Sequence, residues 1–244
     1  MRPIVKLAPG TYINNIDNSQ IIIDSVYNTY QDAKPALIFN LGQFCSYCEE
    51  AYHQPRDLHV EHVQPKTLYP DLETKWDNFL LSCATCNGTD NKGSKDVDLN
   101  EIHLPHLNNT FKSLVYKAGG VVEVNPNLTG LSLSNATNLL NLIRLDKTPK
   151  NSCPGDTRWR KRSDDWNIAE IYKKKYNSGT IDIDTIVDLV KNRGGWSIWF
   201  TVFKGCDEVR KALIDEFPGT AKDCFDPNNG YEPIDRNPGQ PDPV

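Results

Sequence analysis

The sequence predicts an α+β fold, with a small polar core followed by a mainly helical C-terminal extension. Three observations predict it. Residues 45–95 are rich in Cys, His, Asn, Asp and Glu and contain only short apolar runs. Two β-type runs flank a Gly-Gly pair at 119–120, and apolar residues at helical spacing dominate beyond residue 134. At 244 residues and 38% hydrophobic, the chain is long enough to bury a sizeable core.

Residues 1–43 are predicted to be a leader that packs on the following core. Short apolar runs at 21–23 and 36–39 alternate with Asn, Asp and Tyr. The segment from Asp32 to Pro35 has the composition of a turn that precedes a helical stretch.

The core, residues 44–100, contains two Cys-x-x-Cys pairs: Cys45 with Cys48, and Cys83 with Cys86. Together they offer the four thiolates that a structural zinc ion binds tetrahedrally. The alternative is that the pairs are reduced core thiols or redox motifs. Because four thiolates leave no open position, we expect zinc to stabilise the fold and to present the loop between the pairs.

That loop contains an alternating run from Leu58 to Gln64 that is typical of a short strand. Alternation places Val60 and His62 on one side of the strand and His59 and Glu61 on the other. The proline at position 65 ends the run.

A second strand and a helix are expected to complete the core. Residues 76–83 are apolar enough to form a packed element that ends at the second cysteine pair. Residues 87–95 follow that pair, where we expect the start of a helix. The predicted order is therefore strand, strand, helix.

Residues 101–225 are predicted to be a hairpin and a helical extension. Runs at 113–116 and 121–124 flank Lys-Ala-Gly-Gly, whose glycines accept the positive φ of a tight turn. Ser134 is expected to start a helix with apolar residues at 3–4 spacing. Residues 226–244, rich in proline, are predicted to be a flexible tail. Three further helices are expected at 158–176, 184–193 and 207–217.

The net charge of −5 argues against a protein that binds nucleic acid over its whole surface. If the protein cuts nucleic acid, a metal ion, a local basic strip or a partner subunit would have to help it bind the substrate. No apolar run is as long as a membrane span, and no secretory signal precedes the cysteines. Because seven cysteines also make an odd number, we expect reduced thiols in a soluble, cytoplasmic protein.

Glu61-His62, Asn78 and Asn87, bracketed by the two cysteine pairs, resemble the ββα-metal motif of HNH endonucleases. The resemblance implies that His62 is the general base and that Glu61 and Asn87 bind one divalent cation. It also implies that Asn78 orients the loop carrying the histidine. A further ligand one helical turn on would be Asn91. The chain has Asn rather than His at the final position, which binds a metal more weakly.

These residue types suit phosphodiester hydrolysis. Carboxylate and amide oxygens are ligands for Mg²⁺ or Mn²⁺, which would neutralise the scissile phosphate and the leaving oxygen. An imidazole that titrates near neutral pH can accept the proton of the attacking water. His59 is either an extra ligand beside Glu61 or a solvated strand residue.

A narrower resemblance links the chain to the HNH subunits of Septu-type and retron-associated phage-defence systems, the PtuB family. It implies an effector nuclease and a partner ATPase of the ABC/SMC-like type (PtuA), and it leaves open whether the substrate is DNA or an RNA such as tRNA. A partner subunit could also supply the affinity for nucleic acid that a chain with a net charge of −5 lacks. The stretches that carry the resemblance are 36–49, 60–66 and 76–83, with a weaker continuation at 138–144 and 158–160.

Basic residues near the motif are candidates for nucleic-acid contacts: Lys92 and Lys95 after the second cysteine pair, and Arg158 and Arg160 on a predicted helix. The alternative is that these side chains are simply solvated. For the chain as a whole, the alternative to a nuclease is a non-catalytic zinc-binding adaptor that bridges an ATPase to another effector.

Overall fold

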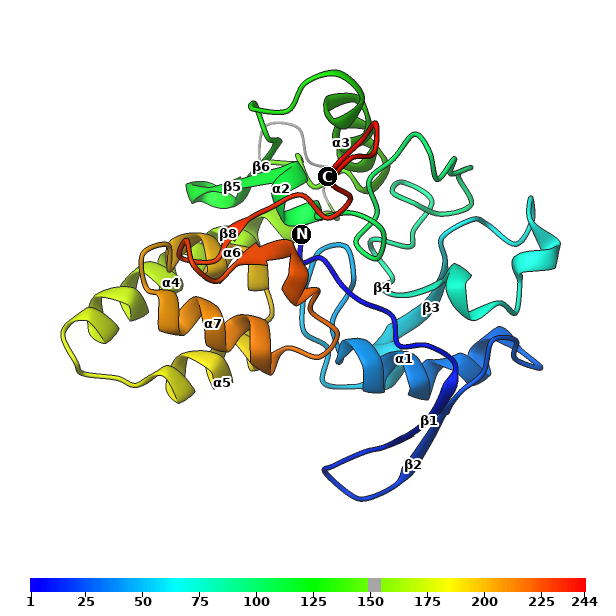
Figure 1. The fold of residues 1–244 in the computed structure, drawn as a ribbon, viewed down its shortest axis with the longest axis horizontal. Helices are drawn as coiled ribbons and strands as arrows, with labels where there is room; N and C mark the ends of the chain where they lie inside the picture. The colour runs from blue at the N-terminus through cyan, green and yellow to red at the C-terminus, as the bar shows by residue number, and fades with distance from the viewer. Residues whose placement is uncertain (149–154) are drawn as a thin grey trace.

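A computed structural model describes residues 1–148 and 155–244 and confirms the α+β class, with a helical C-terminal region. In the described residues the strands form four separate two-stranded antiparallel sheets. Helices α4 to α7 gather at one end of the molecule, away from the β1–β2 hairpin (Figure 1). The strands are β1 (Gly10–Ile13), β2 (Gln20–Ile23), β3 (Leu58–His62), β4 (Phe79–Cys83), β5 (Leu114–Lys117), β6 (Val121–Val124), β7 (Phe225–Asp226) and β8 (Glu232–Pro233). The helices are α1 (Lys34–Leu41), α2 (Thr110–Ser113), α3 (Gly130–Ile143), α4 (Arg158–Asn177), α5 (Ile183–Arg193), α6 (Trp196–Val202) and α7 (Asp207–Glu216).

The N-terminal segment packs on the core through α1. A proline in its first turn suits the helix start, and Gly42 at φ 77° ends it. Its buried residues, including Leu37 and Leu41, belong to the main hydrophobic core, and the helix lies against β3 and β4. A 3₁₀ turn, Tyr30–Ala33, leads into α1.

Strands β3 and β4 form the central hairpin of the core. Leu58 pairs with Cys83 at one end, and His62 pairs with Phe79 at the other. Every residue of β4 is buried, as its apolar sequence predicts. This register places a cysteine of the candidate zinc site at one end of the hairpin and the candidate base at the other.

The helix expected at 87–95 is not formed. Residues 84–95 run through successive turns, with Gly93 at φ 46°. Two glycines and several Asn and Asp residues make this stretch a poor helix former, because their side chains and backbone favour turns. The order strand, strand, turn therefore replaces strand, strand, helix.

The hairpin and the helices of the extension follow the sequence prediction closely, with three differences. The four-residue helix α2 was not predicted. Helix α3 begins at Gly130, one turn before the predicted Ser134. Helix α6 was not predicted, because all but one of its seven residues are buried and the sequence shows no amphipathic period. Trp196 and Phe200 of α6 stack at 4.4 Å between centroids in the core.

Residues 226–244 lie against the molecule, whereas the sequence predicts a flexible tail. Asp242 accepts hydrogen bonds from Ser132 and Asn135 and contacts the buried His103 at 2.8 Å. The Val244 side chain is buried. These partners are over 100 residues away in the chain, so no local pattern announces the docking.

No helix in the described ranges is both long and apolar enough to cross a membrane.

Candidate functional site

The four cysteines come together at one end of the β3–β4 hairpin. The sulfur atoms of Cys45, Cys48, Cys83 and Cys86 lie within 4.8 Å of one another. A zinc ion with Zn–S bonds of about 2.3 Å requires sulfur–sulfur edges of about 3.8 Å. The Cys48 and Cys83 sulfurs are 3.8 Å apart. The donor set and its spacing therefore fit a structural zinc ion.

Arg158 lies beside this cluster, and this corrects its prediction as a nucleic-acid contact. The side chain is 6% exposed, donates to the Cys86 sulfur at 3.2 Å and pairs with Asp156 at 2.8 Å. It also donates to the Ile143 carbonyl at 3.0 Å. Because four thiolates around Zn²⁺ carry excess negative charge, a buried guanidinium at this position offsets part of it.

Asn91, predicted as a further cation ligand, also faces the cysteine cluster. Its Nδ2 donates to the Thr85 carbonyl at 2.8 Å, and its Oδ1 accepts from Arg158 at 3.1 Å. Without a helix after Cys86, Asn91 does not lie one helical turn beyond Asn87. Its amide therefore braces the turn and does not line the pocket described next.

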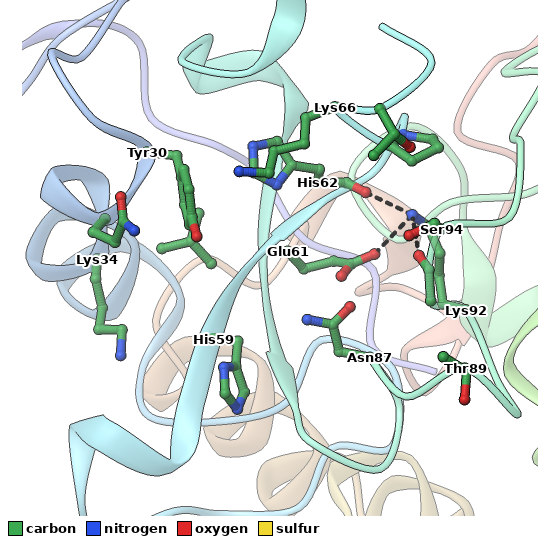
Figure 2. Close-up of a pocket in the computed structure, with 15 residues that line it drawn as sticks. Tyr30, Lys34, His59, Glu61, His62, Lys66, Asn87, Thr89, Lys92 and Ser94 are labelled. Atoms are coloured by element: carbon green, nitrogen blue, oxygen red, sulfur yellow. Dashed lines mark hydrogen bonds and ion pairs between the residues drawn. The ribbon is translucent and has the colours of Figure 1, made fainter. Parts of the chain in front are cut away.

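A pocket of about 390 Å³ lies along β3. It is lined by Glu61, His62 and Asn87, and by the exposed His59. Figure 2 shows the Asn87 amide beside the Glu61 carboxylate, whereas the His62 ring lies on the opposite side of the strand from His59. The structure thus brings the central residues of the predicted motif to one cavity.

His62 is half-buried and firmly oriented. Its Nε2 lies 2.8 Å from the carbonyl oxygen of Glu73. Because a carbonyl only accepts, Nε2 carries the proton and Nδ1 keeps its lone pair. Burial lowers the pKa of His62 below its usual value. The rings of Tyr30 and Phe79 contact the imidazole edge-on, at 4.9 and 5.3 Å between centroids.

Glu61 is only 2% exposed and pairs with an equally buried Lys92, whose Nζ lies 3.1 Å from Oε1. Burial raises the pKa of the Glu61 carboxyl to about 7, against the opposing effect of the Lys92 ammonium. The Tyr47 hydroxyl lies 3.5 Å from the same oxygen. Lys92 is therefore an internal partner of the motif and not the exposed phosphate contact that the sequence predicts.

Asn78 holds the loop that follows His62. Its Oδ1 accepts from the Gln64 amide at 2.8 Å, and its Nδ2 donates to the Gln64 carbonyl at 2.9 Å. Nδ2 also reaches the Leu72 carbonyl at 3.3 Å. This pair of bonds to one residue's backbone fits the orienting role that the resemblance implies.

The far wall of the pocket was not predicted. It comes from the N-terminal segment, with Tyr30 and Lys34, and from the loop after β3, with Lys66. Lys66 Nζ lies 4.4 Å from the centre of the Tyr30 ring and 2.9 Å from the Glu73 carboxylate. Tyr30 and His62 are 32 positions apart, and nothing in the local sequence connects them.

Lys95 and Arg160 are exposed, as a nucleic-acid contact requires. The Lys95 ammonium approaches the Asp90 carbonyl at 3.5 Å, and the Arg160 guanidinium lies 5.8 Å from the Trp159 ring. Their role in binding stays a prediction.

Comparison with known proteins agrees with the resemblance to HNH endonucleases. Residues 45–93 match the HNH endonuclease family, and this span includes both cysteine pairs and the Glu61-His62, Asn78 and Asn87 positions. The chain is also similar to the Septu protein PtuB of Bacillus thuringiensis, with 33% identity over 102 residues. That alignment covers 37% of this chain and 39% of the relative. The chain thus matches well under half of the relative's length.

Proposed function

We propose that this chain is a metal-dependent endonuclease that hydrolyses nucleic-acid phosphodiesters as the effector of an anti-phage defence system. One observation carries the proposal: an oriented imidazole and a carboxylate–amide pair line the same pocket. The HNH match over residues 45–93 and the similarity to a Septu protein support it.

His62 is the general base of the proposed reaction. The Glu73 carbonyl fixes Nε2 as the protonated nitrogen, so Nδ1 is the acceptor for a proton of the attacking water. A lowered pKa keeps the imidazole neutral near pH 7, which a base requires. Asn78 keeps the loop after His62 in place, and the Tyr30 and Phe79 rings restrict the imidazole.

Glu61 and Asn87 are the proposed ligands of the catalytic cation. Both offer hard oxygen atoms, which Mg²⁺ and Mn²⁺ prefer. When bound, the cation would neutralise charge on the scissile phosphate and on the leaving oxygen. His59 lines the same pocket and remains a candidate for an additional ligand.

A chain with a net negative charge repels nucleic acid, so we propose two sources of affinity for the substrate. Lys34 and Lys66 line the same pocket as Glu61 and would contact phosphates next to the scissile one. An ABC/SMC-like ATPase of the PtuA type would supply the remaining positive surface. The proposed substrates are DNA and, as another class, tRNA.

The test is His62→Ala, assayed on plasmid DNA and on tRNA with Mg²⁺ or Mn²⁺. Loss of a general base lowers the cleavage rate by about 10²- to 10⁴-fold. Zinc content and melting temperature should stay near wild type, because the imidazole is half-buried and remote from the cysteine sulfurs. Unchanged cleavage would remove His62 from the chemistry. If the wild type cuts neither substrate, alone or together with the ATPase that copurifies with it, the adaptor function is correct instead.

A further inference from the structure

The ammonium of Lys92 is enclosed by three oxygen atoms. It lies 3.1 Å from Glu61 Oε1, 2.7 Å from the His62 carbonyl and 3.2 Å from the Gly93 carbonyl. An ammonium has three protons, so each can be used. The side chain is 1% exposed. An ion of this kind, buried and fully bonded, holds one geometry.

The three acceptors belong to two different parts of the site. Glu61 and His62 are the last residues of β3, whereas Gly93 lies in the turns that follow the second cysteine pair. The same turns carry Asn87. Because these turns form no helix, they must be held against the rest of the core by other bonds. The cysteine cluster anchors it at Cys86, and Lys92 anchors it to the strand.

The contact with Lys92 also gives the two carboxylate oxygens of Glu61 different surroundings. Oε1 contacts both Lys92 and the Tyr47 hydroxyl. The second oxygen lies on the side of Asn87, as Figure 2 shows. A carboxylate held through one oxygen presents the other in a fixed direction, which is what a metal ligand needs.

We propose that Lys92 is a positioning residue that preassembles the cation site, by holding Glu61 through Oε1 and docking the Asn87 turn on β3. The inference rests on the proposed function. The opposite role is an ammonium that stands where the cation must bind and so excludes it. The two roles predict opposite changes in metal affinity when Lys92 is replaced.

The experiment titrates Mn²⁺ into zinc-loaded full-length chain and follows binding by calorimetry and by the electron paramagnetic resonance signal of free Mn²⁺. Lys92→Gln and Lys92→Met are compared with wild type. Lys95→Met is the matched control, because Lys95 lies in the same turns and is exposed. Positioning predicts about 10-fold weaker Mn²⁺ binding in the Lys92 variants, the loss typical of removing a partner of a metal ligand. Unchanged or tighter binding would overturn the proposal.

A structure of the Mn²⁺-loaded wild type provides a second readout if the variants fail to fold. Positioning predicts that Lys92 keeps its contact with Glu61 Oε1 while the cation binds the other oxygen. A cation in place of the ammonium would refute it. Failure of the proposed function looks different: wild type would bind no Mn²⁺ at the pocket, or His62→Ala would cleave normally.

Discussion

The cysteine cluster and the pocket of Glu61 and His62 are built on one strand pair but have opposite characters. Cys83 and Phe79, the partner of His62, are four residues apart on β4, or about 13 Å. Three of the four cysteines are buried, and all four offer a soft sulfur atom as the ligand. The pocket is open and offers oxygen and nitrogen atoms. The first site suits a permanent zinc ion, and the second suits an exchangeable cation that meets a substrate.

The difference teaches that stability and chemistry can be removed separately. Arg158 and Asn91 serve the cysteine cluster, although the sequence predicts them for substrate and cation binding. Lys92, also predicted for the substrate, serves Glu61. The four residues of the predicted motif retain side chains that face the pocket or hold its loop.

Cys83→Ser should have the largest effect. Structural zinc contributes about 10–16 kcal/mol in small zinc-binding peptides, as much as the whole stability of a typical domain. We therefore expect the variant to lose zinc and the cooperative fold together, as measured by metal analysis and circular dichroism melting. A folded, zinc-loaded product would refute the structural role of the cluster.

Arg158→Ala should destabilise the chain without touching the pocket. Removing the guanidinium leaves Asp156 with only the bond from the backbone amide of residue 158 and removes the partner of the Ile143 carbonyl, at a cost of about 3–5 kcal/mol. Urea unfolding measures this cost. Arg160→Ala, on the exposed side of the same helix, is the control and should change stability by less than ~0.5 kcal/mol. Equal effects of the two variants would contradict the buried role of Arg158.

Lys66→Ala should have the smallest effect and act only on the substrate. An exposed lysine contributes about 0.5–1 kcal/mol, so KM should rise about two- to fivefold. Losing one phosphate contact should also reduce the slope of log affinity against log salt by about 1. Lys211→Ala is the control, because that lysine is exposed on α7 and similarly paired with a carboxylate. If KM and the salt slope both stay at wild type, Lys66 does not contact the substrate.

Patterns within a few residues predicted most of the core. The cysteine spacing, the alternation before Pro65 and the Gly-Gly turn each reflect local backbone preferences, so they could be interpreted from the sequence. Helix α6 could not, since burial on every side removes the amphipathic period.

The contacts that complete the site were beyond local interpretation. Tyr30 reaches His62, Arg158 reaches Cys86, and Asp242 reaches His103 across 32, 72 and 139 positions. Such pairs depend on packing of distant segments. The missing helix after Cys86 is different, because the glycines and the Asn and Asp residues that favour turns there stand in the local sequence itself.

We expect zinc to maintain the fold and a second cation to support cleavage, and metal exchange separates the two roles. Zinc-loaded protein is dialysed against a mild chelator and assayed for zinc, fold and cleavage, before and after Mn²⁺ is supplied. We expect one zinc retained per chain with an unchanged circular dichroism spectrum, no cleavage without Mn²⁺, and full cleavage once it is restored. Cleavage by the zinc-loaded chain with no second cation present would contradict it.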